Sequence, residues 1–328
     1  MNTFLVSFAA LACLAATTPA AAGARPPQYV AISFDGAGPL PQWERSRALA
    51  RETGAHFTYF LSCVYLLTPE TKALYRAPGR KPGRSNVGFA ASREDVAARL
   101  AQIWAAQGEG HDIGSHACGH FDGKDWSAAD WRAEFAAFRR ILRDAWTLNG
   151  IAGEPKGWRA FATHGIAGFR APYLSTGAGL DAALASDGFR YDASGVSRGP
   201  AEPTEQGGLV RFALPLIAEG PAARPVIAMD YNLFVRHSGG NEQTDADGAF
   251  EERAYRAFRD AFRNEYEGSR TPLQIGFHFT LMNDGAYWRA LERFAREACA
   301  TPEVRCVSHA ELADALFPRE TSAIGAAD

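Results

Sequence analysis

Three histidines fall within residues 110–120, and two of them, His116 and His120, are four residues apart among small neighbours. Imidazole is the commonest protein ligand for a catalytic metal ion, and small neighbours allow two rings to turn towards one ion. The same spacing also occurs in ordinary polar loops, so the pair gains meaning only from the rest of the chain. We expect His116 and His120 to hold a metal ion that activates water. His111 precedes the small residues, and we expect it to make a structural hydrogen bond.

Other polar residues stand at the ends of apolar segments that are predicted to be strands. Asp35 ends residues 28–35, and His278 ends residues 273–278. Arg170 stands before Pro172 at another such end, where its charge needs a carboxylate partner. Further acidic candidates are Asp192, in the predicted strand 189–196, and Asp230, in the predicted strand 226–231.

Predicted strands and helices alternate along most of the chain, which indicates a parallel α/β sheet. Helices are expected at residues 42–52, 92–107, 127–148, 179–188 and 249–266, and after residue 284. Candidate residues at the ends of many successive strands are typical of a (β/α) barrel. A doubly wound open sheet is the alternative, although it would gather its site at one switch point.

The composition is ordinary for a globular enzyme, and since no linker or internal repeat divides the chain, we expect one domain, residues 23–328. The chain of 328 residues is 47% hydrophobic and 22% charged, and its net charge of −3 does not favour a nucleic-acid partner. Residues 1–22 are apolar and end in small residues, which predicts a signal peptide cleaved after Ala22 and a periplasmic or secreted protein. An uncleaved membrane anchor is the alternative. No other stretch is apolar and long enough to span a bilayer.

Four cysteines remain after such a cleavage, which permits two disulfides in an exported protein. Cys299 and Cys306 are close in sequence, and we expect them to pair. Cys63 and Cys118 form either a second bridge at the site or two buried free thiols. The irregular segment 64–90 contains a basic run, residues 76–84, which either recognises a polyanionic substrate or is a solvated insertion.

Four motifs, in this order, resemble those of polysaccharide deacetylases of the NodB-homology type (carbohydrate esterase family 4). They are Ile32-Ser33-Phe34-Asp35, His116-Ala117-Cys118-Gly119-His120, Arg170-Ala171-Pro172-Tyr173 and Phe277-His278. The resemblance spans about residues 28–316. It implies a distorted barrel of seven strands, (β/α)7, and a metal-dependent hydrolase of carbon–nitrogen bonds. The implied substrate is an N-acetylated or O-acetylated glycan, such as peptidoglycan or a chitin-like polysaccharide.

The resemblance also implies a role for each matching residue. His116 and His120 would bind a divalent metal, most often zinc. Asp35 would be the catalytic base, oriented by Arg170. The backbone N–H of Tyr173 would stabilise the oxyanion. The remaining role, that of the acid, would fall to His278, with Asp192 or Asp230 keeping it charged.

One departure from the family pattern concerns the metal. The family carries a second acid after the catalytic one, and that acid binds the metal, whereas Gly36, Ala37 and Gly38 follow Asp35 here. Asp35 itself could be the third ligand, another group could replace it, metal binding could be weak, or the chain could be a non-catalytic relative. Two alternatives to a deacetylase therefore stay open: a glycan-binding protein without hydrolysis, and a hydrolase of small amides on the same fold.

Overall fold

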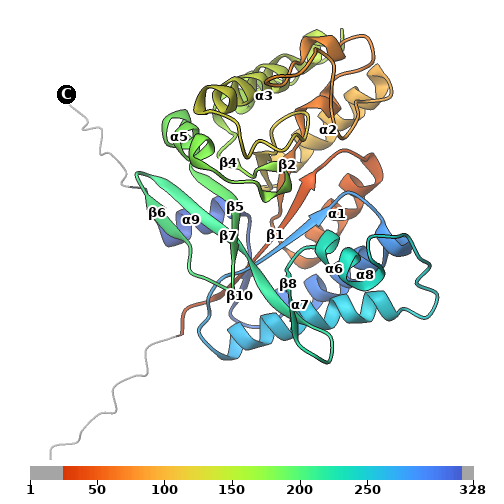
Figure 1. Cartoon of the computed structure of the whole chain (residues 1–328), viewed down its shortest axis with the longest axis vertical. Coiled ribbons are helices and arrows are strands. Elements are labelled where there is room, and N and C mark those ends of the chain that lie inside the picture. Colours follow the sequence, from red (N-terminus) through yellow and green to blue (C-terminus); the bar gives the residue numbers. More distant parts are fainter. Residues whose placement is uncertain (1–24, 320–328) are drawn as a thin grey trace, which may run out of the picture.

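The computed structural model describes residues 25–319, so the predicted signal peptide, residues 1–22, lies outside the described residues. Strands and helices alternate for most of the chain (Figure 1). The strands are β1 (Gln28–Gly36), β2 (Thr58–Leu61), β3 (Asp112–Ser115), β4 (Gly168–Phe169), β5 (Tyr191–Ser197), β6 (Thr204–Gln206), β7 (Leu209–Glu219), β8 (Arg224–Ile227), β9 (Leu273–His278) and β10 (Val304–Cys306). The α-helices are α1 (Leu40–Thr53), α2 (Arg93–Gly108), α3 (Ala128–Leu148), α4 (Trp158–His164), α5 (Ala178–Asp187), α6 (Asp230–Ser238), α7 (Ala249–Glu267), α8 (Met282–Cys299) and α9 (His309–Leu316).

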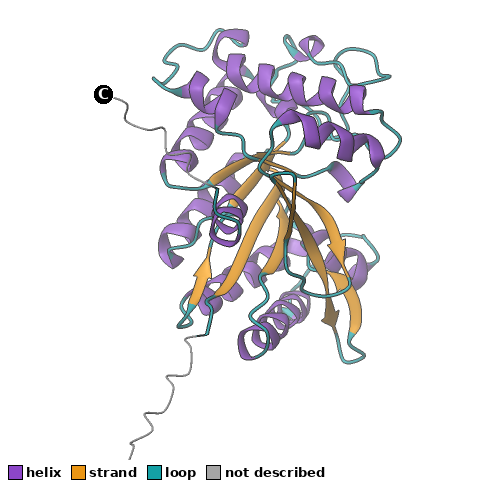
Figure 2. Ribbon diagram, turned by 90° about the vertical axis from the view of Figure 1, so that its left-hand side faces the viewer, coloured by secondary structure: helices purple, strands orange, loops and turns teal. Residues whose placement is uncertain are grey.

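The parallel strands form a curled sheet, a distorted barrel in which β1 is one of the central strands. Strands β1 to β5 and then β7 are paired in parallel in that order, while β9 pairs in parallel with the other edge of β1. The segment after β8 links the two ends of this series, because Ala228 N donates to Pro215 O and Ala228 O accepts from Gly276 N, each at 2.9 Å. Figure 2 shows the curled sheet with helices around it. The predicted (β/α) barrel is confirmed, and the open doubly wound alternative is not what the chain forms.

Buried strands and helix stripes explain this arrangement. The interior residues of β1 form an almost continuous apolar run, as expected for a parallel strand that is covered on both faces. On α3, Ser127 caps the first turn by accepting from Asp130 N. The predicted apolar stripe of this helix is buried in the core: Trp131, Phe135, Phe138, Ile141 and Leu142.

The distortion comes from features that the sequence did not predict. β4 has only two residues, and β6 and β8 form antiparallel pairs with β7. Asp230 was expected near the end of a strand, but it is the first residue of α6, after β8 has ended at Ile227. The short helix α4 was also missed.

Both possible disulfides are formed: Cys299 pairs with Cys306, and Cys63 pairs with Cys118. The alternative of two free thiols at Cys63 and Cys118 is therefore excluded. Among residues 25–319, no helix is both long enough and apolar enough to cross a membrane.

Candidate active site

The predicted site residues gather at one end of the barrel, where its parallel strands end. Asp35 and His278 are direct partners in the pairing of β1 with β9. His116 follows the last residue of β3, and Arg170 follows the last residue of β4. The segments that come after the strands contribute three more predicted residues: His120, Tyr173 and Asp230.

Asp35 and Arg170 form a buried ion pair. Arg170 Nη1 donates to Asp35 Oδ1 at 2.8 Å and to Ser33 Oγ at 2.7 Å, while its Nε donates to Ala193 O at 2.9 Å. Burial alone would raise the pKa of Asp35, but the charge of Arg170, helped by His116 and His278, outweighs burial and lowers it. The carboxylate is therefore ionised near neutral pH. Its Oδ2 accepts no hydrogen bond from the described residues, which leaves that oxygen for water or substrate.

His116 and His120 lie side by side, with their ring centroids 5.0 Å apart. His116 Nδ1 is 2.8 Å from Arg170 O, so Nδ1 carries the proton and Nε2 presents a lone pair. Burial lowers the pKa of His116 to about 3 and also lowers the pKa of His120. Both rings are therefore neutral near pH 7, as a metal ligand or a hydrogen-bond acceptor must be.

His278 faces Asp35 from the neighbouring strand and is held by Asp230. The ring atom Nδ1 lies 2.7 Å from Asp230 Oδ1, and the backbone N of His278 donates to Oδ2 at 2.8 Å. Burial alone would lower the pKa of His278, but the negative charge of Asp230 outweighs burial and raises it. This imidazole is therefore the group in the site best suited to be protonated near neutral pH.

The other acidic candidate, Asp192, serves a different part of the site. Its Oδ1 accepts from Ser194 Oγ at 2.5 Å, and its Oδ2 accepts from Arg211 Nη1 at 2.7 Å. Ser194 Oγ in turn accepts from Ala171 N at 2.8 Å, next to Arg170. In the described structure, Asp192 makes no hydrogen bond with His278. Of the two acids offered as partners of His278, only Asp230 contacts it.

Backbone strain is concentrated in the loops at this end of the barrel, a feature that the sequence did not reveal. Tyr173 and Leu174 have φ values of 59° and 54°, a backbone region that residues other than glycine rarely adopt. Strained residues of this kind cluster at functional sites. The Tyr173 amide donates to no described residue and is free to meet a substrate. The same left-handed conformation recurs after β1, β3 and β9, at Ala37, Ala117, His120, Asn283 and Asp284.

Two solved structures that share this architecture are described as polysaccharide deacetylases. One, from Mycobacterium smegmatis, has a TM-score of 0.53 and 17% identity, covering 91% of this chain and 94% of its own. Another, from Pseudomonas aeruginosa PAO1, has a TM-score of 0.56 and 16% identity, covering 89% and 92%. The chain has the polysaccharide deacetylase fold. The resemblance seen in the sequence motifs is thereby confirmed at the level of the fold.

The same barrel also occurs in a solved structure that is not described as a deacetylase. Puue allantoinase matches with a TM-score of 0.52 and 16% identity over 93% of this chain and 100% of its own. No protein-family model and no curated protein matches this sequence. At these identities the likeness establishes the fold, and the activity must be argued from the site.

The expected zinc site is incomplete in the described structure. Within residues 25–319, no three His, Cys, Asp or Glu side chains are grouped so that they could hold one metal ion. His116 and His120 supply two nitrogen ligands, and the third expected ligand, Asp35, has its Oδ1 bound to Arg170. Catalytic zinc sites have three protein ligands. These residues therefore do not fit such a site, and we assign no step of the reaction to a metal.

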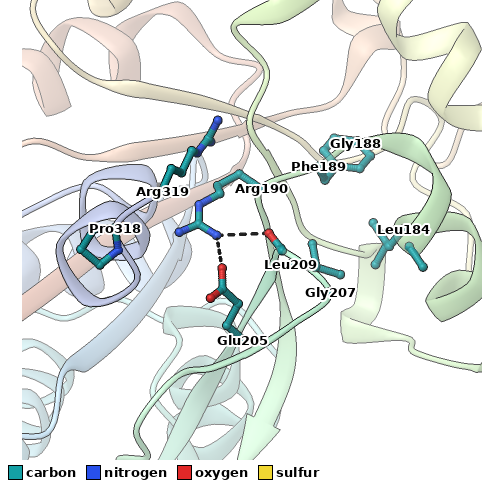
Figure 3. A pocket seen from close by; sticks show the side chains of 11 residues that line it. Leu184, Gly188, Phe189, Arg190, Glu205, Gly207, Leu209, Pro318 and Arg319 are labelled. Carbon is teal, nitrogen blue, oxygen red and sulfur yellow. Dashed lines mark hydrogen bonds and ion pairs between the residues drawn. The ribbon is translucent and has the colours of Figure 1, made fainter. Parts of the chain in front are cut away.

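A separate pocket lies near the opposite end of β5 and has a volume of about 610 Å³ (Figure 3). Arg190 crosses it, donating to Glu205 Oε1 at 2.6 Å and to Gly208 O at 3.1 Å. Because Arg190 precedes β5, the pocket is remote from the strand ends that carry Asp35 and His278. Its two arginines, Arg190 and Arg319, are each paired with a carboxylate, and we assign the pocket no part in the site.

Proposed function

We propose that the chain is an exported hydrolase that removes acetyl groups from N-acetylated glycans, such as peptidoglycan or a chitin-like polysaccharide. The observation that supports the proposal is a pair of ionisable groups on neighbouring strands whose pKa values are shifted in opposite directions. The pKa of Asp35 is lowered beside Arg170, whereas the pKa of His278 is raised beside Asp230. Amide hydrolysis needs a base for water and an acid for the leaving amine.

The reaction follows from these groups. Asp35 Oδ2 takes a proton from water as the water oxygen attacks the acetyl carbon. The carbonyl oxygen becomes an oxyanion, which accepts a hydrogen bond from the Tyr173 amide. The carbon–nitrogen bond then breaks as His278 Nε2 gives its proton to the nitrogen. The products are acetate and a free amino sugar. Asp35 and the newly formed acetic acid each release a proton to solvent, and His278 takes one up, which restores the site.

The remaining residues of the site position these three groups. Arg170 fixes Asp35, and its carbonyl orients His116. By lowering the pKa of Asp35, Arg170 keeps the base ionised but also makes it weaker.

Acetate release from N-acetylglucosamine oligomers tests this proposal. Asp35→Asn and His278→Gln should each lower kcat by about 10²- to 10⁴-fold, because each removes one proton-transfer group. His164→Gln is the matched control, since His164 is exposed on α4 and that helix precedes β4. Wild-type protein that releases no acetate from any N-acetylated or O-acetylated glycan would refute the proposal.

Gly36 favours a second candidate, a glycan-binding protein on the same barrel that does not hydrolyse its ligand. It stands where the family has an acidic metal ligand. A binder would retain affinity for glycan oligomers in the Asp35→Asn variant and release no acetate as wild type. A third candidate, the hydrolysis of small amides, rests on the fold that Puue allantoinase shares, and allantoin is the probe that tests it.

Export is the part of the proposal that rests on residues 1–22 together with the disulfides. Disulfides persist mainly outside the reducing cytosol. N-terminal sequencing of protein recovered from the periplasm or medium should read from Gly23. A protein that stays cytosolic with residue 1 intact would contradict export.

A further inference from the structure

We propose that residues 76–84, named here the basic loop, select a glycan that carries anionic groups in addition to its acetyl groups. This inference rests on the proposed function, because it names the class of substrate used by the same site. The basic loop belongs to the insertion between β2 and α2.

The loop is a concentration of positive charge in a chain of the opposite net charge. The whole chain has a net charge of −3. Between Glu70 and Glu94, however, there is no acidic residue, and the basic residues are Lys72, Arg76, Arg80, Lys81, Arg84 and Arg93. A local excess of this kind creates a positive potential on one part of the surface.

The charges of the basic loop are exposed and are not neutralised by neighbours. Arg76, Arg80, Lys81 and Arg84 are all exposed, and none of them forms an ion pair with another described residue. Most other arginines of the chain are paired with carboxylates, as Arg47 is with Glu109. These four charges are therefore available to a ligand.

The basic loop is folded in a defined way. Arg76 Nε donates to Arg80 O at 3.0 Å, and Gly83 N donates to Tyr75 O at 2.8 Å. The guanidinium of Arg80 lies 5.2 Å from the centroid of the Phe121 ring, just beyond His120 in the chain. Asp122 follows Phe121 in the chain, and its carboxylate accepts from Lys124 N. Another acid, Glu134, accepts from Tyr75 Oη just before the loop and is buried.

The end of the loop is fixed to the candidate active site. Asn86 N donates to Gly119 O at 2.8 Å, and Asn86 Nδ2 donates to His120 O at 3.0 Å and to Tyr173 Oη at 3.4 Å. Asn86 thus contacts both loops that carry site residues. Arg84 is two residues away, so its backbone lies within about 7 Å of Asn86.

At that distance the charges of the basic loop reach a polymer that is bound in the candidate active site. The screening length at physiological ionic strength is about 8 Å, and long cationic side chains extend the reach of the charges. Lysine and arginine bind carboxylate and phosphate through charge-assisted hydrogen bonds. A glycan whose acetylated sugar lies between Asp35 and His278 would therefore bring its neighbouring sugars to the basic loop, where anionic groups bind more tightly than neutral ones.

Three acetylated oligosaccharides of equal length provide the test. One contains only N-acetylglucosamine, one alternates it with glucuronate, and one carries phosphate. We expect kcat/KM to be higher for an anionic oligomer than for the neutral one, and the preference to shrink as salt rises. A preference for glucuronate alone would identify carboxylate as the recognised group, and a preference for both would identify charge in general.

The decisive variant is Lys81→Glu/Arg84→Glu, which should lower the anionic-to-neutral ratio of kcat/KM about tenfold. Arg224→Glu/Arg305→Glu makes the same change in net charge and should leave that ratio as in wild type. Arg224 precedes Asp230 by six residues, and Arg305 pairs with Tyr29, six residues before Asp35, so both lie roughly 20 Å from the site. Lys81→Gln/Arg84→Gln replaces the charge reversal if that change disturbs the fold.

Binding of the glucuronate oligomer, measured by calorimetry, separates this inference from the proposed function. Weaker binding by Lys81→Glu/Arg84→Glu than by the control variant would support the loop's role even if no acetate were released. Equal kcat/KM of wild type for neutral and anionic oligomers at low salt would overturn the inference. So would an anionic-to-neutral ratio and a glucuronate affinity that are the same in the two double variants.

Discussion

The site contains three buried aspartates whose partners give them different chemistry. Asp35 is paired with Arg170, Asp230 with His278, and Asp192 with Arg211 and Ser194. The sequence indicated Asp35 and His278 because each ends an apolar strand. It could not choose between Asp192 and Asp230, because the choice depends on which segment packs beside β9, a contact between residues 48 apart in the chain.

Replacing Asp230 should move the pH profile of the reaction. His278 must be protonated to act as the acid, and Asp230 raises its pKa. In Asp230→Asn the pKa of His278 falls. The alkaline limb of the pH profile, where activity is lost as His278 loses its proton, should therefore move to lower pH than in wild type. The measurement is kcat against pH for acetate release.

The matched control is Asp192→Asn, another buried aspartate that does not contact His278. This variant should lose stability, because Arg211 and Ser194 lose a charged partner, but the alkaline limb of its pH profile should not move. An alkaline limb that stays in place in Asp230→Asn would contradict the assignment of His278 as the acid.

The absent metal ligand can be tested by restoring it. Gly36 has a φ of 84°, so any side chain there is strained by about 1 kcal/mol, although aspartate tolerates this region better than most residues. Gly36→Asp should bind more zinc per chain than wild type after dialysis, measured by elemental analysis. Gly36→Ala carries the strain without the carboxylate and should show no gain. Equal zinc in all three proteins would mean that a carboxylate at this position does not complete the site.

At the scale of elements, the disulfide between Cys63 and Cys118 joins the segment after β2 to the histidine loop. Cys63 N also donates to Ala117 O at 3.2 Å, and Cys118 N donates to Glu134 Oε1 at 2.9 Å. These contacts hold the loop that ends at His120. The sequence left this pairing open because the two cysteines are 55 residues apart.

Removing this bridge should affect both stability and activity. The chain-entropy relation gives about 4 kcal/mol for a loop of that size and about 2 kcal/mol for the shorter loop between Cys299 and Cys306. Cys63→Ser/Cys118→Ser should therefore unfold at lower urea concentration than Cys299→Ser/Cys306→Ser. Only the first variant should also lose activity in the folded state. Loss of activity in both to the same degree would mean that the bridge has no local effect on the site.

The close approach of β4 to β5 gives another test. A Cβ at Gly168 would overlap the Tyr191 ring, so Gly168→Ala must push apart the strands next to Arg170. Overpacking of this kind costs about 1–3 kcal/mol, and we expect a matching fall in the free energy of unfolding, with reduced kcat. Gly199→Ala is the control, because a Cβ there meets nothing within 4 Å. Unchanged stability in Gly168→Ala would contradict close packing of Gly168 against Tyr191.

Across the whole molecule, the sequence predicted the alternating strands and the barrel, but not how the barrel closes. The β6–β7 and β7–β8 hairpins are short, and two of their strands are largely exposed, so they lack a strong periodic signal. The sequence did not predict α6, because the apolar run before Asp230 indicated a strand that continues to residue 231. Closure depends on the hydrogen bonds of Ala228 with β7 and β9, which are long-range contacts that no local pattern encodes.

Buried histidines should make the molecule sensitive to acid. Burial lowers the pKa of His111 and His237 to about 4 and that of His116 to about 3. Below about pH 6.5 the unfolded chain takes up protons that the folded chain does not, so acidification destabilises the fold. Asp112 and His278 oppose this trend in part, because burial raises the pKa of Asp112 to about 6 and the charge of Asp230 raises the pKa of His278.

The net effect should be on the order of 2 kcal/mol of unfolding free energy lost per pH unit between about pH 6.5 and pH 5. Urea unfolding of chelator-treated protein at several pH values measures this slope. The exposed-residue variant His164→Gln should show the same slope as wild type. A free energy of unfolding that stays constant or rises on acidification in this range would contradict the protonation states described.

The bridge between Cys63 and Cys118 also bears on when the chain could become active during its life in the cell. In a reducing cytosol the two thiols would stay apart, and the loop that carries His116 and His120 would lack its covalent tether. If the chain is exported as proposed, oxidation would take place only after it has left the compartment in which acetylated sugar precursors are made. The disulfide would then act as a safeguard, since a deacetylating site would be completed only where its polymer is found.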